Sequence, residues 1–425
     1  MSTTRQELSD SISAAGEVKP PLFNPTAGAT SRPVKTPPRI LRNMLALDDF
    51  EAPARRYIPR PIFGYISGGA ETNASMRGNR AVFDDLAFVP KALVDVRGRT
   101  QKTILFGRTY DAPFGIAPMG GTTMAAYQGD IVLARAAGAA NIPMVLSGAS
   151  LSPLEQVREE GPTAWFQAYL PGETGPITEL VGRVARAGYD TLCLTVDVPV
   201  AANRENNVRS GFHTPLRPSL RLAWDGITRP RWLFGMLART LLLHGMPHFE
   251  NAGPRVPLFT RTGERGWRIR DQLSWNHVEM MRRMWKGRLV LKGILDKEDA
   301  RIARESGVDG IIVSNHGGRQ LDGAIAPLRV LPGIVAQAGA MAVMMDSGIR
   351  RGTDVLKALA LGAQFVFIGR PMLYAAAIAG EAGVRHAIGL LQEEVDRDMA
   401  LLGIATLADM RRERLMDARA KDWLS

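Results

Sequence analysis

The stretch Asp309-Gly310-Ile311-Ile312-Val313-Ser314-Asn315-His316-Gly317-Gly318-Arg319-Gln320-Leu321-Asp322 is the most informative part of the chain. Residues 309–313 form a short apolar run that is typical of a buried β-strand. The loop that follows places an imidazole and a guanidinium three residues apart. Removing a proton from a small acid requires a base that titrates near neutral pH and a cation that holds a carboxylate. A histidine beside two glycines is also a common turn residue, so this motif alone leaves both roles open for His316.

Seven further apolar runs alternate with amphipathic segments of helical period, such as 128–140, 177–187, 297–305 and 353–361. The eight runs are Phe114–Pro118, Met144–Ser147, Ala164–Ala168, Thr191–Val196, Leu289–Lys292, Gly310–Val313, Ala342–Met345 and Phe365–Ile368. This alternation predicts an α/β fold in which helices cover a parallel sheet. Eight units over about 260 residues fit a closed (β/α)8 TIM barrel. An open doubly wound sheet is the alternative, but no G-x-G-x-x-G follows the first run.

Composition and charge divide the chain into parts. Residues 1–42 are polar and lack the apolar core of a secretory signal, so we expect a flexible N-terminal extension before a barrel domain at 43–425. The net charge is +11, and residues 214–270 hold ten arginines, no lysine and three acidic residues. We expect this segment to be a long basic insert after the fourth strand, without a nucleic-acid-binding motif. The single cysteine, Cys193, excludes disulfides and a cysteine-cluster metal site, and we expect no metal. The expected compartment is the cytoplasm or the inner face of its membrane.

Polar residues follow the second to eighth apolar runs, and barrels carry their active sites at these strand ends. They are Ser147, Gln167, Tyr169, Thr195, Asp197, Arg204, Glu205, Lys292, Ser314, His316, Arg319, Asp346, Ser347, Gly348, Arg350, Gly369 and Arg370. Glycines and arginines after the last two strands suit a phosphate. A lysine ending the fifth strand suits an electron-rich ring. The pattern therefore predicts a phosphorylated cofactor beside a base and an arginine.

Motifs spread along the chain resemble those of the FMN-dependent L-2-hydroxy acid dehydrogenases and oxidases. The resemblance covers about Pro59 to Trp423 and implies oxidation of an L-2-hydroxy acid to a 2-oxo acid with bound FMN, in a homo-oligomer that is a tetramer. Its motifs are Tyr65-Ile66-Ser67-Gly68-Gly69-Ala70-Glu71, Ala117-Pro118-Met119-Gly120, Phe166-Gln167-Ala168-Tyr169, Thr195-Val196-Asp197, Asn203-Arg204-Glu205, Ser314–Asp322 and Asp346-Ser347-Gly348-Ile349-Arg350-Arg351-Gly352.

The resemblance implies a role for each matching residue. His316 matches the base and Asp197 its carboxylate partner. Arg319 and Tyr65 match the pair that holds the substrate carboxylate, Arg204 a mobile second arginine, and Tyr169 a tyrosine near the substrate hydroxyl. Lys292 matches the lysine beside flavin N1. The remaining expected cofactor contacts are Pro118, Met119, Gly120, Ser147, Gln167, Thr195, Ser314, Asp346, Ser347, Gly348, Arg350, Gly369 and Arg370.

Small residues in the expected substrate pocket distinguish this chain within the family. Glycolate oxidase carries a tryptophan where this chain has Ala149, and a leucine where it has Ala201. The difference predicts a pocket for an aromatic or long-chain substrate, from lactate-like to mandelate-like. Alternatively, other side chains such as Met119 fill the space.

The insert 214–270 combines arginines with Trp224, the run from Trp232 to Leu237 and Leu241–Leu243, a composition that suits a membrane interface. We expect Trp232, Leu233, Phe234 and Leu237 to insert into the membrane. The run from Arg229 to Pro247 resembles the insert that anchors the membrane-bound lactate and mandelate dehydrogenases. We therefore expect peripheral membrane contact; the alternative is a lid that packs on a sister subunit.

The electron acceptor is the least determined feature. Gly120 stands where soluble oxidases commonly have alanine, which favours a dehydrogenase that passes electrons to a quinone. One alternative is an oxidase that uses oxygen and produces hydrogen peroxide. A remote alternative is a non-catalytic flavin-binding scaffold.

Overall fold

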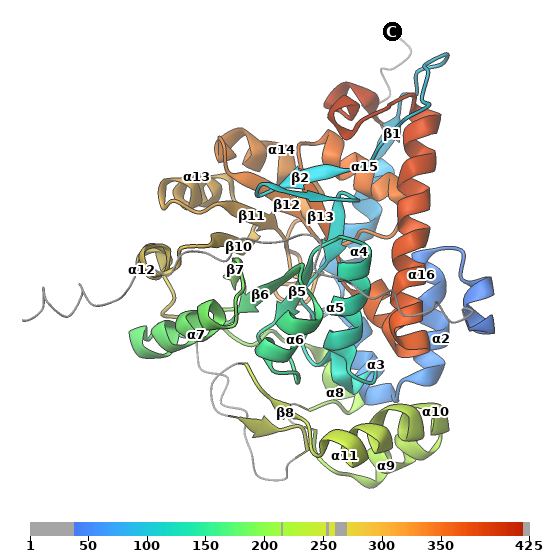
Figure 1. Ribbon diagram of the computed structural model, residues 1–425, viewed down its shortest axis with the longest axis vertical. Helices are drawn as coiled ribbons and strands as arrows, with labels where there is room; N and C mark the ends of the chain where they lie inside the picture. The colour runs from blue at the N-terminus through green and yellow to red at the C-terminus, as the bar shows by residue number, and fades with distance from the viewer. Residues whose placement is uncertain (1–37, 214–215, 252–254, 260–269, 420–425) are drawn as a thin grey trace, which may run out of the picture. The chain divides into compact units, whose positions relative to one another are not determined.

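A computed structural model describes residues 38–213, 216–251, 255–259 and 270–419 (Figure 1). Eight parallel strands close into a barrel in the order β10-β11-β12-β13-β4-β5-β6-β7. The (β/α)8 prediction is confirmed, and the strands lie where the apolar runs were found. Their bounds are β4 Phe114–Ile116, β5 Met144–Ser147, β6 Ala164–Ala168, β7 Thr191–Thr195, β10 Arg288–Ile294, β11 Gly310–Val313, β12 Ala342–Met345 and β13 Phe365–Ile368.

The strands are apolar on both faces because both faces are buried. Successive side chains of a strand point to opposite faces, so each strand supplies two separate cores. The barrel interior contains Val145, Cys193, Val290, Ile312, Met344 and Phe367. The layer between strands and helices contains Leu146, Phe166, Leu194, Leu291, Val313 and Met345. Burial raises the pKa of the Cys193 thiol to about 12, so this thiol stays protonated near neutral pH.

Helices cover the outside of the barrel, as Figure 1 shows. Following their strands in turn are α5 Gly129–Ala139, α6 Leu154–Glu160, α7 Thr174–Arg186, α12 Trp275–Met284, α13 Lys297–Glu305, α14 Pro327–Ala338, α15 Gly352–Ala360 and α16 Arg370–Leu402. Helix α16 is interrupted at Ala379 and Gly380, whose backbone angles are not helical. Its first part completes the eighth unit of the barrel.

A short hairpin closes the N-terminal end of the barrel. It consists of β2 (Thr103–Leu105) and β3 (Arg108–Tyr110). Leu105 and Tyr110 belong to the interior core, and the Phe106 ring lies 5.7 Å from that of Trp165. The opposite end, where the strands finish, remains available for a site.

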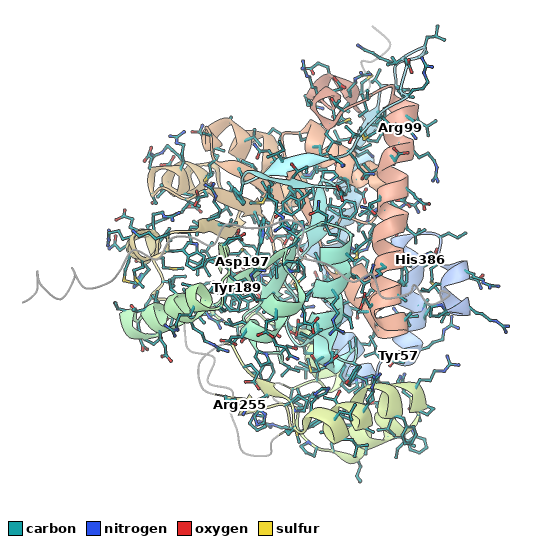
Figure 2. All side chains as sticks on the ribbon, in the orientation of Figure 1. Tyr57, Arg99, Tyr189, Asp197, Arg255 and His386 are labelled. Atoms are coloured by element: carbon teal, nitrogen blue, oxygen red, sulfur yellow. The ribbon has the colours of Figure 1, made fainter. Side chains whose placement is uncertain are left out.

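The segment before the barrel packs against it. Its helices are η1 Arg39–Asn43, η2 Leu47–Phe50, α2 Glu51–Tyr57, α3 Arg60–Ser67, α4 Ala74–Ala81 and η3 Val82–Asp85, and strand β1 (Leu86–Phe88) pairs with β14 (Leu415–Asp417). His386 on α16 bonds the Met44 carbonyl at 2.8 Å (Figure 2). Leu41 is buried in the main core, whereas residues 1–37 of the expected extension lie outside the described residues. The domain boundary at residue 42 stays a prediction.

The insert forms a small helical layer after α8 (Glu205–Ser210). It consists of α9 Leu220–Ile227, α10 Pro230–Trp232, η5 Leu233–Ala238 and α11 Arg239–His244, followed by the hairpin β8 (His248–Phe249) and β9 (Val256–Pro257). Residues 214–215, 252–254 and 260–269 of the insert lie outside the described residues. In the part of the chain that is described, no helix is long and apolar enough to cross a membrane.

One expectation for the insert is wrong. Trp232, expected at a membrane surface, is buried and donates a hydrogen bond from Nε1 to the Met124 carbonyl at 2.8 Å. Leu233 and Leu237 are half-buried, and only Phe234 of the four is exposed. Trp224 and Leu241–Leu243, which the composition also indicated, are exposed, and so are Leu220, Ile227 and Met246. These helices have one apolar face that packs on the barrel, where Trp232 lies, and other apolar side chains that face solvent. Composition alone does not tell which apolar residue belongs to which face.

Candidate functional site

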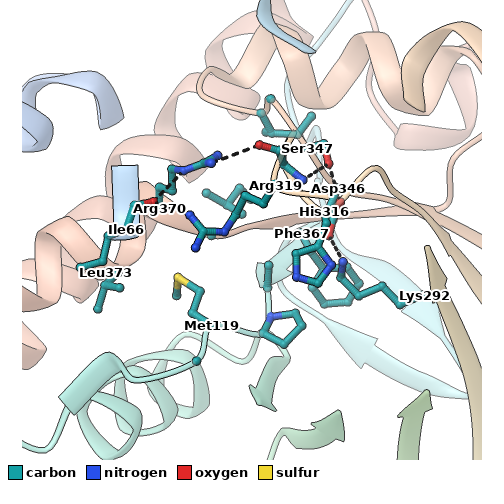
Figure 3. Close-up of a pocket in the computed structure, with 18 of the residues that line it drawn as sticks. Ile66, Met119, Lys292, His316, Arg319, Asp346, Ser347, Phe367, Arg370 and Leu373 are labelled. Atoms are coloured by element: carbon teal, nitrogen blue, oxygen red, sulfur yellow. Dashed lines mark hydrogen bonds and ion pairs between the residues drawn. The ribbon is translucent and has the colours of Figure 1, made fainter. Parts of the chain in front are cut away.

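A cavity of about 1050 Å³ lies at the C-terminal ends of the strands, and we call it the active-site cavity (Figure 3). Most of the residues singled out in the sequence line it, although they come from separate loops. These are Tyr65, Pro118, Met119, Gly120, Ala149, Tyr169, Arg204, Lys292, His316, Arg319, Asp346, Ser347, Gly348, Arg350, Gly369 and Arg370. The structure therefore brings these residues together, whereas the predicted site residues Ser147, Gln167, Thr195, Asp197, Ala201 and Ser314 do not line this cavity.

His316 and Asp197 form a close pair at the edge of the active-site cavity. His316 Nδ1 lies 3.0 Å from Oδ1 and 3.2 Å from Oδ2 of Asp197. The other ring nitrogen, Nε2, is 3.5 Å from the Tyr169 hydroxyl, which is long for a hydrogen bond. A carboxylate at Nδ1 fixes the proton there and leaves Nε2 as the basic nitrogen. The geometry therefore gives the cavity a positioned base.

Backbone conformation positions the side chains of His316 and Asp197. His316 has φ +58°, in the left-handed region that residues other than glycine seldom adopt. Gly293 has φ +109°, and a Cβ placed on it would lie 2.6 Å from the Asp197 Cβ. Only a glycine at this position on β10 allows Asp197 to approach, so the pairing depends on a backbone requirement outside both residues.

Electrostatics keep the pair in the form that a base requires. Burial lowers the pKa of His316 below its usual value, an effect that Asp197 opposes and Lys292 reinforces. Burial alone would raise the pKa of Asp197, but His316 and Lys292 hold it below its usual value. Near neutral pH the imidazole is therefore neutral and the carboxylate is charged. Burial also raises the pKa of Tyr169, so its hydroxyl remains protonated.

Lys292 is a buried cation within β10, two residues before the strand ends at Ile294. Its Nζ lies 2.9 Å from the Ser314 hydroxyl and 3.0 Å from Asp346 Oδ2. Burial alone would lower the pKa of Lys292, but Asp346 and Asp197 raise it, so the ammonium stays charged. Thr195 lies beside Lys292 in the β7–β10 register, and its buried hydroxyl has no hydrogen-bond partner. Ser147 and Gln167 bond each other at 3.2 Å on neighbouring strands.

Two arginines share the backbone carbonyls at the end of α3. Arg319 Nη1 donates to the carbonyls of Tyr65 at 2.7 Å, Ile66 at 3.1 Å and Gly68 at 2.8 Å. Arg370 donates to Ile66 at 3.0 Å and to Gly68 at 3.1 Å. Burial and neighbouring arginines lower the pKa of Arg319 to about 9, and burial lowers that of Arg370 to about 10. Half-buried cations this close together favour anionic ligands beside them.

The loop after β12 adds a further arginine and a special glycine. Arg350 is half-buried and pairs with Asp48 of η2 at 3.2 Å. Gly348 has φ +94°, and a Cβ on it would lie 2.2 Å from the Asn79 carbonyl oxygen. A side chain is therefore excluded where the backbone meets the cavity.

Three further residues support the site, and sequence reasoning gave none of them a role. Gln320 connects Arg204 with Asp197. Arg204 Nη2 donates to Gln320 Oε1 at 2.6 Å, and Gln320 Nε2 donates to the backbone carbonyl of Asp197 at 3.1 Å. The Phe212 ring stacks on Tyr65 at 4.4 Å. The Arg270 guanidinium lies 4.7 Å from the centre of the Tyr169 ring. Gln320 was visible inside the quoted motif, but nothing in the sequence indicated the other two contacts.

A second cavity of about 1390 Å³, which we call the side cavity, adjoins the first. Both are lined by Tyr65, Ala149, Val198 and Arg204, whereas Ala201 lines only the side cavity. Its other walls are largely apolar and include Met124, Pro199, Val200 and Phe249. Met119 lines the active-site cavity, yet the side cavity beyond Ala149 is open.

Comparisons with known proteins agree with this geometry. The family model described as FMN-dependent dehydrogenase matches residues 54–417. The chain is 39% identical over 377 residues to an L-lactate dehydrogenase of Stenotrophomonas maltophilia, covering 88% of this chain and 98% of that protein. It is 41% identical over 370 residues to an L-lactate oxidase of a Nostoc species, covering 86% of this chain and 96% of that protein. A solved structure of the monotopic membrane protein (S)-mandelate dehydrogenase superposes with a TM-score of 0.81 at 35% identity, covering 88% of this chain and 100% of that structure.

These matches span nearly the whole described barrel, and the sequence resemblance is thereby confirmed. The FMN cofactor and the oxidoreductase class follow with it. The chain belongs to the family of FMN-dependent dehydrogenases.

Proposed function

We propose that the protein oxidises an L-2-hydroxy acid larger than glycolate to the 2-oxo acid, with His316 as the base. The observation that carries this proposal is the His316–Asp197 pair, 3.0 Å apart, with the half-buried Arg319 in the same cavity as His316. Oxidation of a 2-hydroxy acid needs a base at the hydroxyl-bearing carbon and a cation at the carboxylate. The relatives reported above are named enzymes, and a scaffold has no need of such a pair, so we set the scaffold alternative aside.

The residues around the active-site cavity fit FMN. Arg350 and Arg370 would hold its phosphate, with Gly348 allowing close backbone approach. The unpartnered Thr195 hydroxyl and the buried Lys292 ammonium would face its polar ring edge. When bound, FMN supplies the acceptor for the two electrons that leave the substrate.

The protein side of the reaction follows from the charges. Arg319 would bind the substrate carboxylate, helped by the Tyr65 hydroxyl and by Arg204 once it leaves Gln320. This contact orients the hydroxyl-bearing carbon. Nε2 of His316 would take the proton that the substrate loses, and Asp197 would stabilise the imidazolium that forms. The protonated Tyr169 hydroxyl would donate to the substrate oxygen.

The side cavity supports a substrate with a bulky side chain. Ala149 is buried at the boundary between the two cavities, so a side chain on the substrate can pass from one into the other. The solved relatives include a mandelate dehydrogenase and a mandelate oxidase, the latter with a TM-score of 0.73 at 35% identity. An apolar wall suits an aromatic or aliphatic group.

The proposed acceptor is a quinone reached at a membrane surface. The insert exposes large apolar side chains, among them Trp224 at 68%, Phe234 at 68% and Leu242 at 84%. Contiguous exposed apolar surface beside arginines suits a membrane interface. Oxygen remains the second candidate acceptor, because the Nostoc relative is named an oxidase.

Anaerobic flavin reduction by a panel of L-2-hydroxy acids tests the proposal. Mandelate-sized acids should bleach the flavin faster than glycolate, and a quinone analogue should restore its colour faster than air. His316→Gln should retain FMN and lose reduction by several orders of magnitude. Reduction by His316→Gln at the wild-type rate would contradict the proposed base, and rapid recovery in air would assign the acceptor as oxygen.

A further inference from the structure

A third cavity, of about 860 Å³, lies apart from the reacting residues and is lined by four arginines. We call it the basic cavity. Arg55 comes from α2, Arg60 begins α3, Arg209 lies on α8 and Arg229 precedes α10. The Ser67 and Ser210 residues also line it. Three elements of the barrel domain and the start of the insert helices therefore converge on one concentration of positive charge.

Carboxylates only partly neutralise this charge. Among the described residues no acidic side chain lines the basic cavity, and no ion pair forms at Arg60. Arg55 and Glu51 are 3.6 Å apart, and Arg229 and Asp225 are 3.9 Å apart, beyond hydrogen-bond distance. Arg209 is the exception, since it bonds Glu205. These arginines therefore retain donors for an anion.

Arg229 gives a second indication of a missing partner. Its Nε is buried and has no hydrogen-bond partner, although buried polar atoms are normally bonded. Its Nη1 bonds only the neighbouring Thr228 hydroxyl, at 3.1 Å, and approaches Asp225. An oxyanion in the basic cavity would provide the acceptor that this guanidinium lacks.

The C-terminal end of α3 does not oppose an anion here. Ser67 and Gly68 line the basic cavity, and carbonyls at a helix C-terminus carry negative partial charge. The Gly68 carbonyl, however, accepts hydrogen bonds from Arg319 and Arg370 on the other side. Two guanidinium groups thus offset the one local feature that would repel a bound anion.

The position of Arg229 connects the basic cavity with apolar surface. The exposed Trp224 and Ile227 lie just before it on α9, and the exposed Phe234 follows on η5. Figure 1 shows α3 and α8 next to the layer formed by α9, α10 and α11. A ligand with an anionic head and apolar tails matches this arrangement of charge and apolar surface.

We propose that the basic cavity binds the phosphate group of an anionic phospholipid, whose acyl chains lie against the exposed apolar side chains of the insert. The proposal rests on the membrane contact proposed above and specifies the lipid and its site. Arginines bind phosphate oxygens through paired, charge-assisted hydrogen bonds. The protein would therefore select anionic over zwitterionic membranes at one defined place.

Co-sedimentation of the FMN-loaded full chain with phosphatidylglycerol or phosphatidylcholine vesicles tests this. The double variant Arg60→Gln/Arg229→Gln should bind phosphatidylglycerol about 100-fold more weakly or worse, because each arginine loses a charge-assisted hydrogen bond to the phosphate that contributes roughly tenfold. The matched control Arg56→Gln/Arg231→Gln removes the same charge from the same two regions, but neither residue lines the basic cavity. It should lose far less affinity. Equal losses in both doubles would indicate diffuse electrostatics and overturn the site.

A gain-of-function variant guards against misfolding. Asp225→Asn should bind phosphatidylglycerol several-fold more tightly, because Arg229 loses its competing carboxylate. No gain would count against Arg229 as the anion contact. The FMN absorbance of every variant reports folding.

Soluble anions distinguish the source of the phosphate. Titration calorimetry should give weaker binding of inorganic phosphate and glycerol 3-phosphate than of vesicles. Tight binding of either anion, lost in Arg60→Gln/Arg229→Gln while vesicle binding persists, would overturn the lipid assignment. Wild-type protein that binds neither vesicle would refute the membrane contact itself. Equal wild-type binding to both vesicles would refute only the headgroup site.

Discussion

Replacing Asp197 with asparagine tests the proposed base, because the change removes one charge and preserves the shape of the site. Asparagine matches aspartate in size, so the close contact with Gly293 remains possible. The wild-type carboxylate lies 3.0 and 3.2 Å from His316 Nδ1 through its two oxygens. In the variant an amide oxygen can still accept from Nδ1, but it no longer carries the charge that stabilises an imidazolium.

The structure gives a magnitude for this loss. Two unit charges about 4 Å apart interact by about 4 kcal/mol at an effective dielectric constant of 20, the value suited to partly buried pairs. Every 1.36 kcal/mol on a barrier changes the rate tenfold, so flavin reduction should fall about 10³-fold. The amide can also turn its NH₂ group towards Nδ1, which would place the proton on the wrong nitrogen and add to the loss.

Anaerobic stopped-flow reduction of the bound flavin at saturating substrate measures the effect directly. Asp299→Asn is a suitable control, because it removes an acidic residue from the nearby α13 without touching His316. FMN content should match the wild type in both variants. A reduction rate for Asp197→Asn within tenfold of the wild type would show that Asp197 does not stabilise the imidazolium, and the electrostatic argument would be wrong.

Three other predictions concern the substrate site. Arg319→Met should lower kcat/KM by about 10²–10⁴, because the substrate carboxylate loses two charge-assisted hydrogen bonds of about 1.5–3 kcal/mol each. Unchanged steady-state kinetics would exclude Arg319 as the carboxylate ligand. Ala149→Trp should lower kcat/KM about 10- to 100-fold for mandelate-sized acids and much less for glycolate, because overpacking costs about 1–3 kcal/mol. Equal losses for both acids would show that Ala149 does not line the substrate pocket. Burial lowers the pKa of His316 below its usual value, so kcat/KM should be constant at neutral pH and fall only as the pH drops into the acidic range, where the imidazole takes up a proton. A midpoint above 7 would contradict the burial of the imidazole.

The sequence by itself determined the barrel and its cofactor class. Each strand must be apolar on both faces because one meets the interior and the other meets a helix, and this constraint is local and therefore readable. Polar residues after such strands can only lie on one rim, which is why His316, Arg319 and Lys292 were found together. The FMN family followed from motifs whose residues are adjacent in the chain.

Tertiary structure alone decided the contacts between distant segments. The pairing of Asp197 with His316 depends on Gly293, and the Phe212–Tyr65 stack joins two loops with no shared pattern. The same limit explains the error at Trp232, which is buried against Met124 rather than exposed. An amphipathic helix shows in its sequence that it has an apolar face. Whether that face meets protein or membrane depends on what the rest of the chain places beside it, and local composition carries no information about that neighbour.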